Sequence, residues 1–220
     1  MERNFLMTQK EFWERESLKE RRSPNHPAVR AFASQKIKEI LKFIKPNKNM
    51  SLLDVGCGNG FFTEPFSKIF NTKGVDFSQK MLSMNPVKGC EVQDANNLKE
   101  KDSSFDIVFC SNLLHHLENP ERAIKEMKRV SRKYVILSEP NRNNPLMFLF
   151  SILKKEESGA LKFSLAYLKE LCDSNNLKII HSRTLGAVVP NKTPVWLVPI
   201  LRLFDRFLGF YILVISEVKR

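Results

Sequence analysis

The stretch that most constrains the fold is SLLDVGCGNGFF, residues 51–62, in which a short apolar run leads directly into Gly56, Gly58 and Gly60. Glycine adopts positive φ at little cost and has no side chain, so a loop of this kind brings the backbone close to a ligand. The run before it has the length and composition of a buried strand. The stretch therefore predicts a strand, a tight loop and a ligand at the carboxyl end of that strand.

Strand and helix patterns alternate along the rest of the chain. We expect strands at 50–56, 72–78, 90–95, 105–111, 133–140, 177–185 and 209–218, and helices at 32–44, 61–70, 120–130 and 164–176. Strands that alternate with helices form a mostly parallel sheet covered on both faces. The pattern predicts an α/β fold with a doubly wound, Rossmann-like sheet of seven strands in a single domain.

In such a sheet the ligand lies beyond the carboxyl ends of the strands, near the point where the strand order reverses. Polar residues follow several of the predicted strands: Asp76, Asp94, Ser111 with Asn112, and Glu139. An acidic residue at the end of the second strand suits the two hydroxyls of a ribose.

Two kinds of cofactor compete for this arrangement. A nicotinamide dinucleotide usually requires Gly-x-Gly-x-x-Gly, whereas the spacing here is Gly-x-Gly-x-Gly with Asp54 just before it. The tighter loop favours a ligand that has an ammonium and a carboxylate instead of a pyrophosphate. Asp54 would then order the polar network beneath the amino-acid end, or alternatively it caps the next turn.

With LLDVGCGNG, GVDFSQKML, VQDANNL and the segment 105–140 in this order, the chain resembles the class I S-adenosylmethionine-dependent methyltransferases from about Ile37 to Val218. It is most similar to the branch that includes ubiquinone and menaquinone methyltransferases. The resemblance implies S-adenosyl-L-methionine as the cofactor and a sheet that ends in an antiparallel strand. It also implies a methyltransferase domain over residues 37–220, with residues 1–36 as a basic helical arm or lid.

The resemblance also implies a role for each matching residue. The three glycines would hold the methionine part and Asp76 the ribose. Other residues of the implied site are Phe77 and Met81 near the adenine, Asp94 and Ala95 at its edge, and Asn112 near the methionine carboxylate and the transferred methyl. Phe77 and Met81 would serve a hydrophobic core equally well.

Methyl transfer from a sulfonium depends mainly on the alignment of donor and acceptor, so a general base is optional. His115 and His116, in NLLHHLENP after the fourth strand, are the candidates for that base because a neutral imidazole accepts a proton near pH 7. The alternative is that one histidine caps the following helix and the other packs against it.

The acceptor is less constrained than the cofactor. Enzymes that methylate amino groups of adenine or glutamine carry Asn/Asp-Pro-Pro-aromatic after the fourth strand, where this chain has CSNL, and Cys110 follows Phe109 instead of the proline that cytosine C5 enzymes need. We therefore predict a small-molecule or lipid-like acceptor, with nucleic acid less favoured. RNA or protein methylation, and a non-catalytic accessory protein that binds the cofactor, stay open as alternatives.

The net charge of +12 lies in the flanks, because acidic and basic residues balance over residues 51–140. The segments NPLMFLFSILKK (144–155) and PVWLVPILRLFDRFLGFY (194–211) each predict an amphipathic helix. These helices could line an apolar acceptor pocket, rest on an anionic membrane, or pack in the core. At the other end, Phe12 or Trp13 could close over the cofactor as a lid, or the segment could form a frayed basic arm.

Four cysteines without a Cys-x-x-Cys pair, and no histidine at zinc-finger spacing from them, indicate neither a disulfide framework nor a metal site. The first 22 residues contain no apolar run of the kind that a signal peptide needs. We expect a cytoplasmic protein that is either fully soluble or attached peripherally to a membrane.

Overall fold

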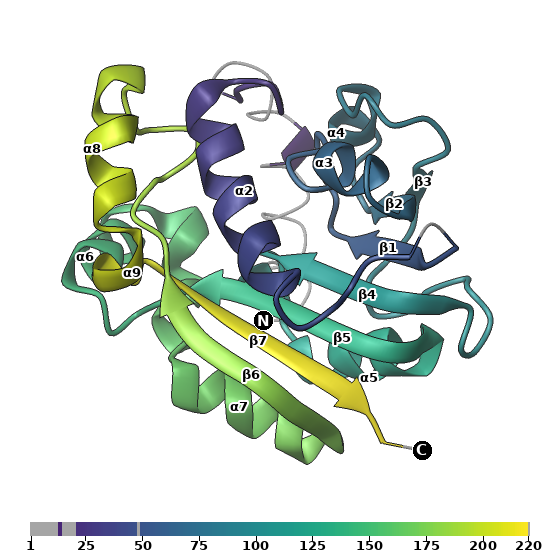
Figure 1. Cartoon of the computed structure of the whole chain (residues 1–220). Helices are drawn as coiled ribbons and strands as arrows, with labels where there is room; N and C mark the ends of the chain where they lie inside the picture. Colours follow the sequence, from purple (N-terminus) through teal and green to yellow (C-terminus); the bar gives the residue numbers. More distant parts are fainter. Residues whose placement is uncertain (1–12, 15–20, 48, 220) are drawn as a thin grey trace.

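The computed structural model describes residues 13–14, 21–47 and 49–219. Within them the strands form a seven-stranded sheet in the order β3-β2-β1-β4-β5-β7-β6 (Figure 1). The strands are β1 (Ser51–Val55), β2 (Asn71–Asp76), β3 (Glu91–Val92), β4 (Phe105–Ser111), β5 (Ser131–Pro140), β6 (Leu177–Leu185) and β7 (Tyr211–Val218). Strand β7 pairs antiparallel with both β5 and β6, and the other pairs are parallel. The predicted fold class is confirmed.

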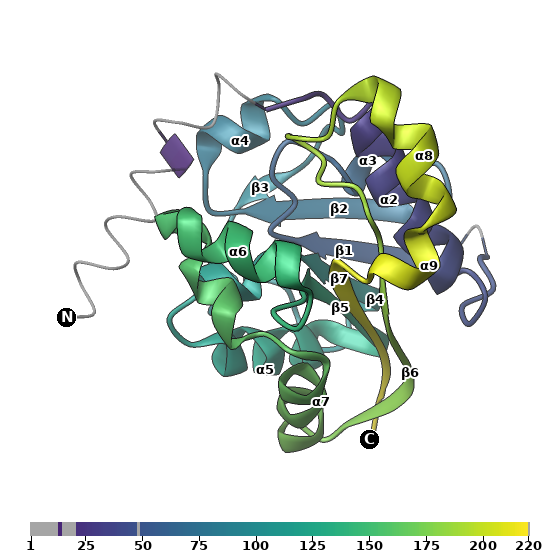
Figure 2. The same ribbon diagram turned by 90° about the vertical axis from the view of Figure 1, so that its left-hand side faces the viewer.

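Helices cover both faces of the sheet (Figures 1 and 2). They are α2 (Pro27–Ile40), α3 (Thr63–Ser67), α4 (Gln79–Ser83), α5 (Pro120–Val130), α6 (Pro145–Leu153), α7 (Leu165–Ser174), α8 (Val198–Leu203) and α9 (Asp205–Leu208), with 3₁₀ segments η1 (Leu114–His116), η2 (Lys155–Lys162) and η3 (Val195–Leu197). Helices α2 and α3 contribute to the core on one face of the sheet, and α5 and α7 to the core on the other.

Helix α5 has the bounds that the sequence predicts because both its ends and its inner face are locally encoded. Asn119 accepts a hydrogen bond from the Arg122 amide (3.0 Å), and Pro120 occupies the first turn. The three residues at helical spacing that the sequence places on one face, Ile124, Met127 and Val130, are all buried. Full burial of an aliphatic side chain such as these stabilises the fold by about 1.5–3 kcal/mol.

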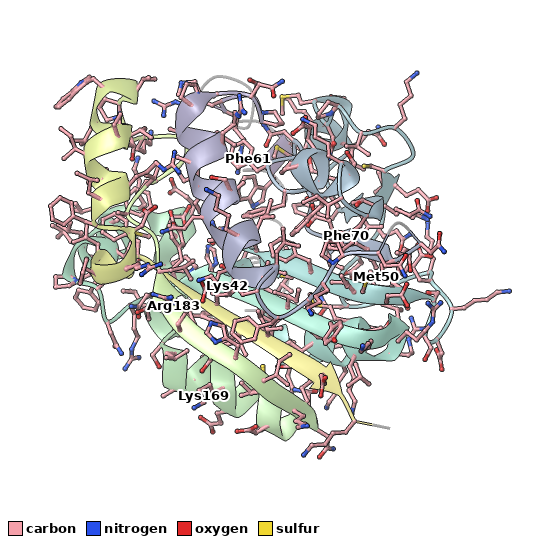
Figure 3. All side chains as sticks on the ribbon, in the orientation of Figure 1. Lys42, Met50, Phe61, Phe70, Lys169 and Arg183 are labelled. Carbon is pink, nitrogen blue, oxygen red and sulfur yellow. The ribbon has the colours of Figure 1, made fainter. Side chains whose placement is uncertain are left out.

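Helix α2 begins five residues before the predicted helix of residues 32–44, and residues 41–44 form a turn after it. Its Glu39 joins it to the edge strand β6, since the carboxylate accepts from Arg183 (3.3 Å). Lys42, which follows the helix, also donates to Glu39 (2.5 Å), and Figure 3 labels both of these basic residues. The boundary that we expect between residues 36 and 37 lies inside this helix.

The prediction of a single amphipathic helix over 194–211 is wrong. The segment forms η3, α8 and α9, with a turn at Phe204 between the last two. Gly209 ends α9 with φ +59, and a Cβ there would lie 2.9 Å from the Thr184 hydroxyl. The apolar side chains of this segment are also largely outside the core, with Phe207 82% and Trp196 72% exposed.

Candidate active site

A cavity of about 1020 Å³ lies beyond the carboxyl ends of β1 and β4, the neighbouring strands between which the strand order reverses. Nearly all of the residues predicted for the site line it: Asp54, Gly56, Gly58, Asp76, Phe77, Met81, Asp94, Ala95, Asn112, His115 and His116. Gly60 does not line it. A Cβ on Gly60 would instead lie 2.8 Å from Asn85 Oδ1, so this glycine allows the loop to pack against Asn85.

The glycine loop is held by backbone hydrogen bonds to the neighbouring strand. The amides of Gly56 and Cys57 both donate to the Val75 carbonyl, at 2.8 and 3.0 Å. Gly56 has φ +74, and a Cβ on it would lie 2.9 Å from Leu113 Cδ2. A side chain at this position is therefore excluded both by backbone conformation and by the β4 loop that packs against it.

Asp76, at the end of β2, holds the same loop from the other side. Its Oδ2 accepts from the Gly58 amide (2.8 Å) and its Oδ1 from the Ser78 amide (2.9 Å). Burial raises the pKa of Asp76, and these two backbone donors oppose the shift. Because a carboxylate oxygen accepts more than one hydrogen bond, both oxygens keep capacity for hydroxyls of a ligand in the cavity.

Asp54 lies beneath the loop, where it is 2% exposed and accepts from the Thr63 hydroxyl (2.7 Å). Burial raises the pKa of Asp54 to about 7, and the hydrogen bond from Thr63 opposes the shift. Its carboxyl oxygen joins β1 to the first turn of α3. This contact fits both interpretations of Asp54, a support for the polar network and a cap for the next turn.

The four residues predicted for the adenine lie on the β2 and β3 side of the cavity. Met81 is 3% exposed, on α4, and Phe77 lies just before that helix. Asp94 is exposed and accepts from the Asn96 amide (2.8 Å), with Ala95 between them. Apolar and polar groups are thus brought together at this end as an adenine ring requires.

Asn112, directly after β4, is a residue with positive φ (+53) that is not glycine. Its amide donates to the Ser138 carbonyl (2.8 Å). Its side-chain Oδ1 is buried and has no hydrogen-bond partner among the described residues. A buried acceptor without a donor is costly, so this oxygen, in a residue that lines the cavity, points to a ligand that donates to it.

Glu139, at the end of β5, organises the turn that follows Asn112. One of its carboxylate oxygens accepts from the amides of Leu113 and Leu114 (3.0 and 2.9 Å). The other lies 2.5 Å from Nδ1 of His115. A fully buried carboxylate on β5 therefore fixes the conformation of η1.

His115 lies between two carboxylates, since its Nε2 is 3.2 Å from Glu157 of η2. Burial disfavours charge on His115, but Glu139 and Glu157 outweigh it and raise the pKa to about 9. At neutral pH this ring is protonated and cannot accept a proton. The prediction that His115 serves as a general base has no support from this geometry.

His116 is in the opposite state. Burial, together with the charge on His115, lowers the pKa of His116 to about 3, so the ring is neutral and weakly basic. Its Nδ1 has no hydrogen-bond partner in the described part of the chain. Trp13 contacts the ring edge-on, with 5.1 Å between the centroids, and both residues line the cavity. The lid stays a prediction, and Phe12 is outside the described residues.

Arg21 is a residue of the cavity that the sequence did not single out. Its guanidinium lies 4.4 Å from the ring centroid of Trp13 and 5.9 Å from that of Phe61. Burial lowers the pKa of Arg21 to about 10, with Glu157 and Asp76 opposing, so it stays charged at neutral pH. Its contacts with described residues are these two rings, without a hydrogen bond or ion pair, which leaves its donors available to an anionic group.

Lys36 is a second cation that the sequence did not reveal. It is fully buried behind the cavity, with Nζ 3.3 Å from the Ser111 hydroxyl and about 4 Å from the ring centroids of Phe32 (4.0 Å) and Tyr211 (4.1 Å). Burial lowers the pKa of Lys36 well below its usual value, and Glu139 opposes the shift. A lysine on an amphipathic helix normally faces solvent, so no local pattern marks this one.

Residues 53–137 match the family model described as a methyltransferase domain. Among curated relatives, the probable tRNA methyltransferase 9B of Mus musculus is 28% identical over 118 residues, which cover 53% of this chain and 26% of that protein. The phosphatidylethanolamine N-methyltransferase of Cereibacter sphaeroides is 35% identical over 92 residues, 37% of this chain and 45% of that protein. The chain thus spans less than half the length of these relatives.

Among solved structures, the magnesium protoporphyrin IX methyltransferase of Synechocystis PCC 6803, with bound SAH, superposes with a TM-score of 0.68 at 15% identity, over 97% of this chain and 100% of that one. At 15% sequence identity, this similarity shows a shared fold and nothing about the substrate. Together with the matched methyltransferase domain of residues 53–137, it confirms the predicted resemblance to the class I S-adenosylmethionine-dependent methyltransferases.

Proposed function

We propose that this class I methyltransferase domain transfers the methyl group of S-adenosylmethionine to an apolar, lipid-like acceptor. The groups that line the cavity fit the polar parts of that cofactor. Asp76 has acceptor capacity for ribose hydroxyls, the unpaired Oδ1 of Asn112 suits the ammonium, and the guanidinium of Arg21 suits the carboxylate. The bound sulfonium would supply an activated methyl group.

The protein's contribution to the reaction would be alignment. His115 is held charged by two carboxylates and His116 is a weak base, so neither has a pKa near neutrality, where general bases are most effective. Glu139 instead fixes the η1 turn next to the glycine loop, which gives the transfer site one geometry. Alignment of this kind contributes about 7–11 kcal/mol in well-oriented systems.

Helix α6 carries the argument for an apolar acceptor. Met147, Phe150 and Lys154, at helical spacing, line the cavity. The opposite face is also apolar, yet it is exposed, with Leu149 53% and Leu153 71% accessible. A short helix that is apolar towards both the cavity and the outside gives a hydrophobic molecule a continuous path between the two.

The exposed face of α6 belongs to a larger apolar surface. Among the described residues, the exposed large apolar side chains other than Phe43 and Val92 all lie on α6 or in the segment of η3, α8 and α9: Leu146, Phe148, Leu149, Ile152, Leu153, Val195, Trp196, Ile200, Leu203, Phe204 and Phe207. Asn144, which caps α6, donates to the Leu208 carbonyl of α9 (2.6 Å), and these helices lie on the same side of the molecule (Figures 1 and 2).

An apolar surface with basic residues around it suits the interface of an anionic membrane. Arg202 and Arg206 are exposed between the apolar residues of α8 and α9, and Lys154 is exposed at the end of α6. Within the described residues, none of the helices has the length and apolar character needed to span a bilayer. We propose peripheral attachment through this surface, and the cytoplasmic location stays a prediction.

RNA methylation is the alternative that the net charge of +12 and the similarity to a probable tRNA methyltransferase keep open. A non-catalytic accessory protein that binds the cofactor is another. In the direct test, the protein is incubated with methyl-labelled S-adenosylmethionine and one fraction of a cell extract at a time. The three fractions contain lipid, RNA and protein, respectively. Label in the lipid fraction supports the proposal. Label in RNA or protein instead would contradict it, and cofactor binding with no labelled fraction would favour the accessory role.

The apolar surface is tested separately with Phe204→Glu combined with Phe207→Glu. Both side chains are exposed, at 48% and 82%, so we expect the double variant to fold and to bind the cofactor as the wild type does. Flotation with anionic vesicles should be lost, whereas Phe204→Leu with Phe207→Leu, which keeps the surface apolar, should retain it. Wild-type binding should weaken only in part with salt, because burial of apolar area is not screened. Vesicle binding that survives the glutamate substitutions would contradict the proposal.

A further inference from the structure

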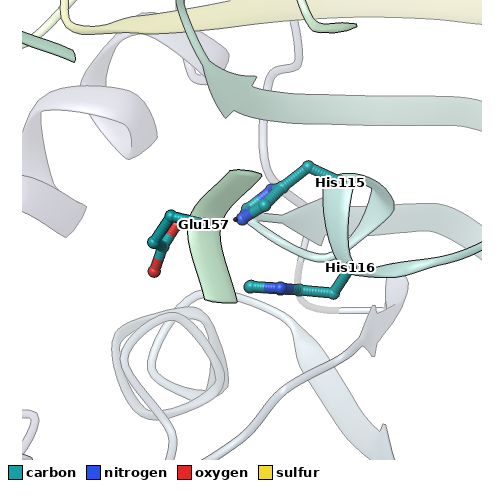
Figure 4. A group of neighbouring side chains, drawn as sticks. All are labelled: His115, His116 and Glu157. Atoms are coloured by element: carbon teal, nitrogen blue, oxygen red, sulfur yellow. Dashed lines mark hydrogen bonds and ion pairs between the residues drawn. The ribbon is translucent and has the colours of Figure 1, made fainter. Parts of the chain in front are cut away.

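Three metal-ligating side chains meet in the wall of the cavity. His115 and His116 come from η1, and Glu157 comes from η2 between α6 and α7. One potential ligand atom from each lies within 4.8 Å of the other two, and Figure 4 shows both imidazole rings directed towards the side on which Glu157 lies. All three residues line the cavity.

His115 already has the arrangement of a metal-bound histidine. Such residues almost always donate their second ring N–H to a carboxylate or carbonyl, which fixes the ring and leaves the other nitrogen for the ion. Here Nδ1 faces Glu139 at 2.5 Å, so Nε2 is the nitrogen directed at Glu157. Two ligands about 2.0–2.1 Å from a tetrahedral ion are about 3.3 Å apart, close to the observed Nε2–Oε2 separation. That separation is 3.2 Å.

His116 supplies a second, independent observation. The residue is 8% exposed, and its Nδ1 has no hydrogen-bond partner among the residues that the structure describes. The ring also makes a hydrogen bond with the backbone of Glu156, which must use Nε2 because Nδ1 has none. The neutral ring thus carries an unused lone pair on Nδ1, and a buried acceptor of this kind is satisfied by an ion or a donor.

We propose that His115, His116 and Glu157 bind a divalent transition-metal ion such as Zn²⁺. Two imidazole nitrogens and one carboxylate suit first-row ions of this type and not Mg²⁺ or Ca²⁺, which prefer oxygen ligands. On binding, the proton on Nε2 of His115 is released to solvent. Three protein ligands leave a coordination position open, and the cavity is the space next to it. An ion there could polarise an oxygen of the acceptor, a step that rests on the proposed function, whereas the binding itself does not.

The charge distribution around His115 also fits a bound cation. Glu139 and Glu157 bring two carboxylates to one imidazole, in a part of the cavity where Arg21 and Lys36 are the nearby cations named above. With a dipositive ion bound, Glu157 becomes a direct ligand and Glu139 orients His115 from behind. The pattern of carboxylate, histidine and ion recurs in metal sites.

Calorimetric titration of chelator-treated protein with Zn²⁺, in the absence of S-adenosylmethionine, tests the proposal without any methyl transfer. We expect one site whose affinity falls at least about 10-fold in His116→Gln and in Glu157→Gln. Glu156→Gln is the matched control, because this carboxylate also lines the cavity but is outside the cluster. The thiols of Cys57 and Cys90 interact closely, so Cys90→Ser is included to test whether they compete for zinc.

The ligand type is read directly with Co²⁺ in place of Zn²⁺. We expect the wild type and Cys90→Ser to show visible absorption bands of bound Co²⁺ without sulfur-to-cobalt charge transfer. We expect Glu157→Gln to lose these bands. The two ligand variants lie on different elements, and circular dichroism with cofactor binding reports whether each is folded. Unchanged Zn²⁺ affinity in a folded His116→Gln or Glu157→Gln protein would overturn the proposal. Loss of binding in Cys90→Ser alone would do the same, because it would assign the ion to the thiols.

Discussion

The interaction of Asp76 with the cofactor gives the sharpest prediction. In the structure each carboxylate oxygen already accepts one backbone amide, from Gly58 and from Ser78. The proposed ribose hydroxyls would use the remaining acceptor capacity. A hydrogen bond to a charged group contributes about 1.5–3 kcal/mol, so Asp76→Ala should weaken S-adenosylhomocysteine binding by about 10- to 160-fold. Calorimetry measures this directly.

Removal of the carboxylate also frees the two amides, so an effect on the loop must be separated from an effect on the ribose. Ser78→Ala serves as a control, because Ser78 caps α4 by accepting from the Met81 amide (3.1 Å) without contributing an acceptor for the ligand. It should lower the free energy of unfolding but leave cofactor affinity within a few-fold.

A ligand analogue that lacks one ribose hydroxyl tests the contact with Asp76 from the side of the ligand. The 2′-deoxy analogue of S-adenosylhomocysteine should bind the wild type more weakly than the parent compound, and this difference should vanish in Asp76→Ala. If the deoxy analogue is penalised equally in both proteins, Asp76 does not bind the ribose. The assignment also fails if Asp76→Ala binds the parent compound as the wild type does.

Three further predictions concern single residues. Arg21→Gln should reduce cofactor affinity by about 10-fold or more, because a charged donor to the carboxylate is lost; equal affinity in a titration would remove Arg21 from the site. Burial raises the pKa of Asp54 to about 7 in the folded protein, so the folded state is stabilised while Asp54 is protonated. As pH rises from about 4 to 7, the free energy of unfolding of the wild type, measured in urea, should fall by up to about 1.4 kcal/mol per pH unit relative to that of Asp54→Asn. A difference independent of pH would refute this. Burial lowers the pKa of Lys36, so above that pKa the wild type should gain stability relative to Lys36→Met as pH rises towards about 10.4, the ordinary lysine value; a falling difference would contradict it.

The sheet was predictable because its determinants are local. Strands β1, β4, β5 and β7 each contain a short apolar run, and α5 carries its own cap, its proline and its apolar face. The break between α8 and α9 was not predictable, because the apolar residues on both sides of Phe204 continue the helical spacing. The 3₁₀ segment η2 was missed as well, since its sequence, KEESGALK, has no apolar periodicity.

The candidate site divides in the same way. The glycine loop, Asp76 and Asn112 follow strands directly, so a strand prediction also places them at one edge of the sheet. Glu157 lies 42 residues from His115 in the sequence, in a segment without a pattern, and its approach depends on how α6 and η2 fold back over η1. Arg21 and Lys36 are ordinary basic residues in the sequence, and only tertiary burial distinguishes them.

Glu139 connects these two classes of residue. Its position at the end of β5 was visible in the sequence, but its role was not, because the carboxylate turns back to accept from the amides of Leu113 and Leu114 and to face His115. A buried carboxylate is tolerated only when donors surround it, so the fold of η1 and the burial of Glu139 depend on each other. A reaction that relies on alignment loses about 100-fold when a group moves by about 1 Å. In the proposed reaction, the stability of this turn therefore contributes as directly as a contact with the cofactor would.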